Sequence, residues 1–164
     1  PASRGRRIMG MSITLKEYLQ DCDIDFDEIE HPYQATSMST ANSARIDGDE
    51  LAKGVLLRDE RGYVMAVLPS SHMIDLFKIS QKFDRNFDFA SENELEALFD
   101  DCDPGAVPPI GSAYGMKVMW DDSLQGKPDI YFEGGDHRTV VQISGDDFSR
   151  LMATANHARF SHHV

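Results

Sequence analysis

Residues 51–68 read LAKGVLLRDERGYVMAVL, and this stretch decides the fold class. Two runs rich in valine and leucine, about Ala52 to Arg58 and Gly62 to Leu68, are joined by the link Asp59-Glu-Arg-Gly62. A link this short that contains glycine favours a β-hairpin, so the two predicted strands are antiparallel. Pro69 closes the second strand, because proline cannot donate a ladder hydrogen bond.

Helical and extended segments alternate irregularly on both sides of the hairpin. The predicted helices cover residues 14–22, 39–46, 74–83, 91–99 and 144–152. The further predicted strands cover residues 24–30, 87–89, 116–120, 130–133 and 138–143. Thr14-Leu-Lys-Glu17 and Ser91-Glu-Asn-Glu94 have the pattern of capping boxes. Because the longer helical connections permit parallel pairs, we predict an α+β (mixed α/β) fold. Its single domain holds a strongly curved, mixed but mostly antiparallel sheet or barrel of six to seven strands, surrounded by helices.

The composition is that of a globular protein, and two cysteines far apart in the sequence, with no C-x-x-C motif, suggest reduced thiols in a cytoplasmic protein. The chain has 164 residues, of which 41% are hydrophobic and 27% charged, a balance that excludes a disordered chain and suits one domain. Its longest apolar runs, such as Val64-Met-Ala-Val-Leu68, are too short to cross a membrane.

Residues 1–10, PASRGRRIMG, differ from the rest because they contain three arginines and no acidic residue. We interpret them as a tag, a linker or the remnant of an upstream domain, and place the domain at residues 11–164. Without them the balance is 13 Lys and Arg against 28 Asp and Glu, a net charge of −15 in place of −12. This charge disfavours nonspecific binding to nucleic acid or anionic lipid, so we expect no DNA or membrane partner.

Lys53 and the loop Pro104-Gly-Ala-Val-Pro-Pro-Ile-Gly111 are the first candidate site. The residues that flank Lys53, Ala52 and Gly54, are small, so its ammonium can approach a ligand closely. Glycine and proline at this density exclude a helix or a central strand, but they can hold a stiff curve of peptide groups. A lysine facing such a loop suggests a phosphate at one end of a ligand and a polar, uncharged group at the other. The alternatives are a solvated lysine and a rigid connector.

No nucleophile or metal site is recognisable. The chain has no G-x-S-x-G elbow, and neither of its two cysteines has a basic neighbour that would lower its pKa. The six histidines show no ligand spacing, so we expect no metal and no cofactor. Thr36 and Ser39 are read first as helix-capping residues, with a pocket role for a hydroxyl as the second possibility.

From about Thr14 to Phe160 the sequence resembles the YbaK/EbsC group, the prolyl-tRNA-synthetase-associated editing domains. Four segments carry the resemblance. They are His31-Pro32 with the Ser/Thr-rich run that follows it, the strand around Lys53, the G-x-x-x-P loop Gly105-Ala-Val-Pro-Pro109, and the turn in Tyr131-Phe-Glu-Gly-Gly-Asp-His-Arg138. The group implies a mixed α/β barrel and the deacylation of mischarged aminoacyl-tRNA.

The resemblance implies roles for several residues. It puts Lys53 at the phosphate and ribose of the terminal adenosine, and Gly105 at the ester, where backbone groups hold the amino group and polarise the carbonyl. These two are the predicted catalytic residues. The predicted substrate-binding residues are Thr36, Ser39, Pro109, Gly111, Gly135 and His137. Water positioned by a ribose hydroxyl of the tRNA, without a covalent intermediate, is the implied mechanism.

Three functions remain open at this point. The first is a trans-editing hydrolase acting on the acceptor end of aminoacyl-tRNA, with an upstream domain or a synthetase as a possible partner. The second is a non-catalytic ligand- or tRNA-binding regulatory module on the same fold, part of a larger signalling protein. Its support is the acidic charge, since tRNA is itself a polyanion. The third, a metal-dependent hydrolase, has the least support in the residues.

Overall fold

A computed structural model describes residues 10–34 and 36–164 of the chain. Nine residues of the predicted tag or remnant, 1–9, lie outside this range, as does residue 35. The α-helices are α1 (Ile13–Asp21), α2 (Ser37–Ala44), α3 (Leu76–Lys82), α4 (Glu92–Leu98) and α5 (Gly145–Leu151). The strands are β1 (Asp27–Glu30), β2 (Leu51–Asp59), β3 (Gly62–Pro69), β4 (His72–Ile74), β5 (Asp88–Phe89), β6 (Lys117–Asp121), β7 (Asp129–Glu133), β8 (Thr139–Ser144), β9 (Asn156–Ala158) and β10 (Ser161–His163).

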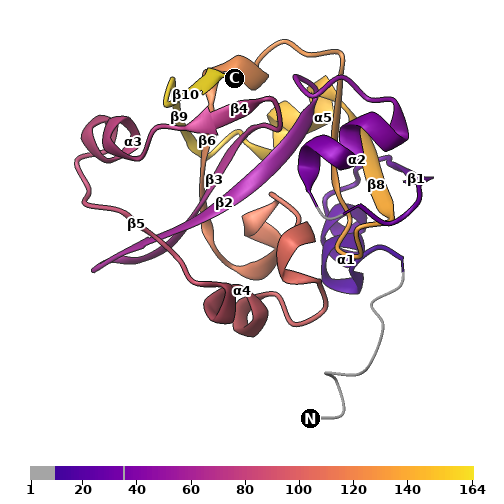
Figure 1. Cartoon of the computed structure of the whole chain (residues 1–164), viewed down its shortest axis with the longest axis horizontal. Helices are drawn as coiled ribbons and strands as arrows, with labels where there is room; N and C mark the ends of the chain where they lie inside the picture. Colours follow the sequence, from indigo (N-terminus) through magenta and orange to yellow (C-terminus); the bar gives the residue numbers. More distant parts are fainter. Residues whose placement is uncertain (1–9, 35) are drawn as a thin grey trace.

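The predicted hairpin is confirmed, and it forms the middle of the sheet. β2 and β3 pair antiparallel from Ala52↔Pro69 to Asp59↔Gly62. In the described part of the chain the main sheet has eight strands, in the order β1-β8-β7-β2-β3-β6-β9 with β5 added beside β2. β2 crosses the molecule diagonally, with α2 near the end where it begins and the hairpin tip projecting at the other side (Figure 1).

The sheet mixes the two pairing senses, as predicted. β1–β8, β7–β8, β2–β3 and β2–β5 are antiparallel, while β2–β7, β3–β6 and β6–β9 are parallel. The α+β class and the curved mixed sheet are therefore confirmed. The two ends of this order, β1 and β9, are not paired with each other in the residues described, so the sheet is not closed by a ladder.

Opposite faces of the sheet hold different hydrophobic clusters, because side chains alternate along each strand. The larger cluster includes Ala52 and Phe132 and packs against Leu15 and Leu19 of α1 and Phe148 of α5. On the other face, one cluster joins β2, β3 and α3, and a small one joins α2 to β2 and β8. These helices therefore cover both faces and hold the strand ends in place.

Several predicted boundaries are corrected. Helix α1 is capped by Ser12, whose hydroxyl accepts a hydrogen bond from the Leu15 amide, so the predicted capping box at Thr14 is wrong. The box at Ser91 and Glu94 is confirmed with both of its hydrogen bonds. Strands β4, β9 and β10 were not predicted, because segments of three residues carry little periodic signal. In the described part of the chain, no helix is both long and apolar enough to span a membrane.

Candidate functional site

Lys53 lies near the start of β2, where the strand loses a neighbour. β7 pairs with β2 at Leu51 and Ala52, and β5 pairs with it at Leu57 and Arg58. Between these pairs, residues 53–56 have β3 on one side and no strand partner in register on the other, among the described residues. The predicted catalytic lysine therefore belongs to an open stretch of strand edge.

The Lys53 side chain is half-buried, and its Nζ donates a long 3.5 Å hydrogen bond to the carbonyl oxygen of Ser70. Burial lowers the pKa of this ammonium. In the part of the chain that the structure describes, no carboxylate lies within 4.0 Å of it. A partly desolvated cation without an anionic partner gains free energy when it binds an anion, so Lys53 is suited to a phosphate.

The Gly/Pro loop packs against the next residue of β2. A Cβ placed on Gly54 would lie 3.1 Å from the Cα of Pro109 and 2.5 Å from the Sδ of Met65. One on Gly111 would lie 2.9 Å from the Cβ of Met65. Glycine at positions 54 and 111 thus allows the loop to approach the strands closely. Pro109 and Gly111 are buried in this contact.

The loop contains more regular structure than its composition predicted. A 3₁₀ turn covers Pro104–Ala106, and a second covers Gly111–Tyr114. Proline is tolerated at the start of such a turn, because its missing amide hydrogen would have no partner there. The prediction that this segment excludes a helix holds for α-helix but misses both 3₁₀ turns. Gly105 lies within the first turn and is exposed.

Lys53 and Pro109 lie on opposite faces of β2. Ala52 belongs to the larger core cluster and Leu51 to the small cluster under α2. By alternation Lys53 points to the α2 side, whereas Gly54 points toward the loop. The prediction that Lys53 faces the Gly/Pro loop is therefore wrong for the part of the loop around Pro109, because strand alternation puts the two on opposite faces of β2.

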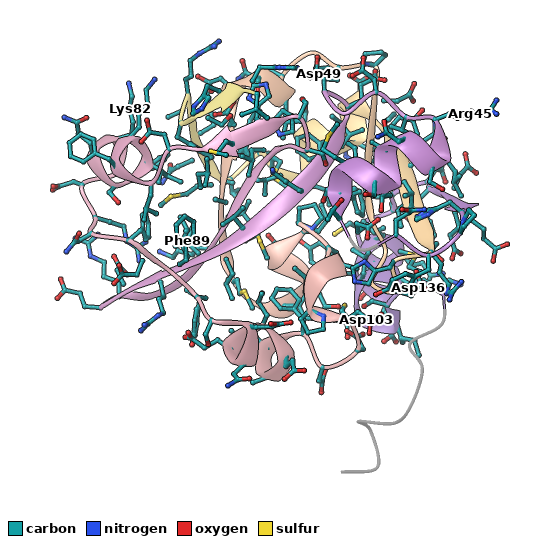
Figure 2. All side chains as sticks on the ribbon, viewed as in Figure 1. Arg45, Asp49, Lys82, Phe89, Asp103 and Asp136 are labelled. Carbon is teal, nitrogen blue, oxygen red and sulfur yellow. The ribbon has the colours of Figure 1, made fainter. Side chains whose placement is uncertain are left out.

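The turn that follows β7 is tied to the start of the loop. The Asp103 amide donates a 2.7 Å hydrogen bond to the Gly135 carbonyl oxygen. Gly135 has φ +127°, a conformation that favours glycine, and a Cβ there would lie 3.1 Å from the Sγ of Cys102. Asp103 and Asp136 mark this junction, on the side of the molecule away from Lys82 (Figure 2). The predicted residue Gly135 is thus joined to the loop that carries Gly105.

Thr36 is the N-cap of helix α2, so its capping role is confirmed, whereas Ser39 lies in the first turn and is the residue that Thr36 caps. The Thr36 Oγ1 accepts a 3.1 Å hydrogen bond from the Ser39 amide and donates one of 2.8 Å to the Ser39 hydroxyl. Both residues are accessible: Thr36 is exposed and Ser39 is partly buried. A further contact of either hydroxyl with substrate remains a prediction.

His137 is buried beside a carboxyl group that the sequence did not single out. Its Nδ1 lies 3.7 Å from the Oε2 of Glu133, and the Nε2 of His31 lies 4.0 Å from the other oxygen, Oε1. Burial, reinforced by nearby Asp136 and opposed by the neighbouring hydroxyl of Thr40, raises the pKa of Glu133 to about 8. Strand alternation predicts Glu133 to be solvent-facing, so the sequence gives no signal for this cluster.

Other parts of the molecule do not add to this arrangement. A groove of about 820 Å³ lies between the hairpin tip and α3, and its lining residues include Arg58, Phe77 and Arg85 but none of the predicted site residues. Among residues 10–34 and 36–164, no group of three His, Cys, Asp or Glu side chains is arranged to hold a metal ion. Burial raises the pKa of the Cys102 thiol to about 12, so it is a poor nucleophile.

Comparison with known proteins identifies the family. Residues 31–151 match the model of the aminoacyl-tRNA editing domain, a range that includes Lys53, the Gly/Pro loop and the turn after β7. The chain belongs to the aminoacyl-tRNA editing domain family. A search of curated proteins found no significant match.

Solved structures share the fold at low sequence identity. A candidate trans-editing enzyme for prolyl tRNA synthetase superposes with a TM-score of 0.80 at 19% identity, over 92% of this chain and 96% of the other. The hypothetical protein APE2540 gives 0.79 at 18% identity, over 91% and 99% of the two chains. A candidate signal transduction protein from Marinobacter aquaeolei VT8 gives 0.72 at 19% identity; 93% of this chain matches 31% of that longer protein.

Proposed function

We propose that this protein is a trans-editing hydrolase, which cleaves the ester of a mischarged aminoacyl-tRNA at its terminal adenosine. The observation that carries the proposal is Lys53, a half-buried cation with no carboxylate partner among the described residues, at an open edge of β2. Membership of the editing-domain family supports it. A cytoplasmic location, where charged tRNA is used, and a synthetase or an upstream domain as partner belong to the same proposal.

Lys53 would bind the phosphate and ribose of the terminal adenosine. Its compact charge suits a phosphate oxygen, and its burial makes the contact stronger than it would be in water. Because the molecule carries a net charge of −12, the tRNA must be bound at a small positively charged site around Lys53 rather than over a broad basic surface. This confines recognition to the acceptor end.

The loop that contains Gly105 would hold the aminoacyl ester. Backbone amides fixed in a stiff turn cost no reorganisation when negative charge develops on the carbonyl oxygen, and each donor contributes about 3 kcal/mol. Gly105 is exposed and lies in a 3₁₀ turn, so a ligand can approach its backbone, although the next amide, that of Ala106, already donates to the Asp103 carbonyl oxygen. The buried residues Pro109 and Gly111 would hold this loop against the sheet. Gly135 and His137, in the turn after β7, would lie at the side of the ester site.

Water, rather than a protein nucleophile, would attack the ester. The Cys102 thiol is buried with a pKa raised to about 12, and the Thr36 hydroxyl is engaged in the helix cap. The ester is already activated, so binding it beside an oriented water can provide most of the rate enhancement.

The test is turnover of tRNA charged separately with alanine, cysteine or proline, each with and without a chelator. Hydrolysis of at least one substrate well above the uncatalysed rate, unchanged by the chelator, is the expected result. Loss of activity on chelation would support a metal-dependent hydrolase instead. Tight binding of every substrate with no turnover would contradict the deacylase proposal.

A second candidate is a regulatory module that binds an aminoacyl or nucleotide ligand without hydrolysing it. The acidic charge favours it, and so does the match to a 31% share of a longer candidate signal transduction protein. Binding without turnover in the same experiment is the outcome that selects it.

A further inference from the structure

Four buried polar atoms without hydrogen-bond partners meet around Glu133. They are the Nε2 of His31, the Oγ1 of Thr40, the Oε1 of Glu133 and the Nδ1 of His137. They come from the segment before α2, from α2 itself, from the end of β7 and from the turn that follows. Nearly all buried polar atoms in folded proteins have a partner, so a concentration of orphans at one carboxyl group calls for a physical explanation.

The position of the hydrogen on the His31 ring determines whether its other nitrogen, which faces Glu133, can accept a hydrogen bond. Its Nδ1 lies 2.7 Å from the carbonyl oxygen of Pro32, and a carbonyl only accepts, so Nδ1 carries the hydrogen. When Nδ1 carries the ring's one hydrogen, Nε2 is an acceptor, and it faces the Oε1 of Glu133 at 4.0 Å. An ionised Glu133 would place a negatively charged oxygen opposite the lone pair on the Nε2 of His31, and the two would repel each other. A protonated Glu133 removes that repulsion, and small side-chain shifts that close the gaps of 4.0 Å to His31 and 3.7 Å to His137 would let it donate to the first and accept from the second.

The surroundings of the Glu133 carboxyl favour the protonated form. The side chain of Glu133 is 6% exposed and that of His31 is 1% exposed, so water contributes little solvation. The charged and titratable groups that face the cluster are Asp136 on the turn and Asp103 on the loop, besides the two histidines; α2 contributes the neutral hydroxyl of Thr40. Burial and the carboxylate of Asp136 disfavour a negative charge on Glu133, in agreement with its pKa of about 8.

The cluster joins two segments that border the candidate site. The His31 amide donates a 2.8 Å hydrogen bond to the Arg138 carbonyl oxygen, and the Gln34 amide donates one of 3.2 Å to that of His137. The His137 ring lies 4.9 Å from the ring of Tyr33. The segment leading to Thr36 and Ser39 is therefore held against the turn that carries Gly135, with Glu133 between them.

We propose that Glu133 is a positioning residue of the editing site, whose buried side chain lies between His31 and His137 and helps to fix the start of α2 relative to the turn after β7. The inference rests on the proposed function for its kinetic consequences, but not for its structural ones. Ionisation of Glu133 would place a negative charge opposite the Nε2 of His31 and beside the carboxylate of Asp136. The two backbone hydrogen bonds between these segments would remain, but we expect the side chains of His31 and His137 to move and the start of α2 to shift relative to the turn.

The experiment compares the full chain with Glu133→Gln, Glu133→Ala and the control Glu96→Gln, an exposed glutamate on α4. Gln mimics the protonated acid, because its amide both donates and accepts. In ¹⁵N-labelled protein, the imidazole signals of His31 and His137 and the amide signals of Ser39 and Gly135 are followed from pH 6.5 to 9.5. We expect the four signals to shift in one common step near pH 8, in the wild type and Glu96→Gln but not in Glu133→Gln.

Deacylation is measured over the same pH range, with the uncatalysed hydrolysis subtracted. One pH unit above its pKa an acid is about one-tenth protonated, so kcat/KM of the wild type should fall about tenfold between pH 7 and 9. Glu133→Gln should vary by less than about twofold over that range, and Glu133→Ala should be at least about tenfold slower throughout.

The NMR titration and the deacylation assay together distinguish failure of the positioning role of Glu133 from failure of the proposed function. If no charged tRNA is hydrolysed, the proposed function fails, and the common NMR step still decides the role of Glu133. If the wild type lacks the step, or Glu133→Gln retains it, the positioning role is wrong. A high-pH decline in activity that persists in Glu133→Gln also overturns it. Should Glu133→Ala fail to fold, the comparison of wild type with Glu133→Gln remains decisive.

Discussion

Gly54 of β2 and Pro109 of the Gly/Pro loop are in such close contact that a Cβ on Gly54 would lie 3.1 Å from the Cα of Pro109. The same atom would lie 2.5 Å from the Sδ of Met65. The methionine tail can move, but the proline backbone is fixed by two prolines in sequence. This contact is where the loop meets the strand that carries Lys53, so it sets the position of one relative to the other.

Gly54→Ala should therefore lower both stability and activity. Overpacking a close contact costs about 1–3 kcal/mol, and the loop can relieve it only by moving away from β2. Chemical denaturation measures the first effect, and deacylation at a temperature well below the melting midpoint measures the second. Wild-type stability together with wild-type kcat/KM would show that the loop does not need this approach.

Lys53→Ala should abolish turnover with little change in fold. The lysine is half-buried but its ammonium makes one long hydrogen bond, so its removal should change the unfolding free energy by less than about 1 kcal/mol. Loss of an electrostatic contact to a phosphate should reduce kcat/KM by about a hundredfold or more. Lys82→Ala, an exposed lysine at the end of α3, is the control for loss of one positive charge. Full deacylation by Lys53→Ala with an unchanged melting temperature would contradict the assignment.

The parts of the fold that were predictable are those encoded by neighbouring residues. The hairpin follows from two β-rich runs and a four-residue link, and its register is confirmed from Ala52↔Pro69 to Asp59↔Gly62. Strand β9 could not be predicted, because three residues from Asn156 to Ala158 are held in place by pairing with β6 rather than by their own pattern. The cap of α1 was misplaced by two residues, since Ser12 and Thr14 are both good capping residues.

The candidate site, like the fold, has one part that the sequence predicted and one part that it did not. Lys53 and the loop were found from composition and from a family resemblance, and the contact between Gly54 and Pro109 joins their segments. The buried cluster was not found, because His31 and Glu133 are about a hundred residues apart and each alone looks ordinary. A carboxyl group near the end of a strand is normally solvated. It becomes unusual only when folding brings α2 over it.

Gly105→Val should affect activity far more than stability. Gly105 is exposed and lies in a 3₁₀ turn, so a side chain there meets solvent rather than core, and the cost should stay below about 1 kcal/mol. A branched side chain would nevertheless occupy the space next to the peptide groups that are proposed to hold the ester. Thermal unfolding and single-turnover deacylation provide the two measurements. Destabilisation by several kcal/mol with normal turnover of the folded fraction would identify the loop as a connector.

Asp101 holds the beginning of the loop segment to α1 and to the second 3₁₀ turn. Its carboxylate accepts hydrogen bonds from the Ser12 hydroxyl at 2.8 Å, the Thr14 amide at 3.0 Å and the Tyr114 hydroxyl at 2.7 Å. Burial alone would raise its pKa, but these donors outweigh burial and lower the pKa to about 2. The network thus depends on the ionised form.

Asp101→Asn should destabilise the protein at neutral pH by about 1–2 kcal/mol, allowing for partial solvent screening. Because the native pKa lies below the unfolded value of about 3.9, the stabilisation is present above about pH 4 and is lost as the pH falls through 2. The gap between wild type and Asp101→Asn should therefore narrow as the pH is lowered from 6 to 3, in urea unfolding at each pH. Asp100→Asn, the exposed neighbour, should track the wild type throughout. A gap that is independent of pH would mean that the three donors do not depend on the charge of Asp101, and the loop would then be anchored by packing alone.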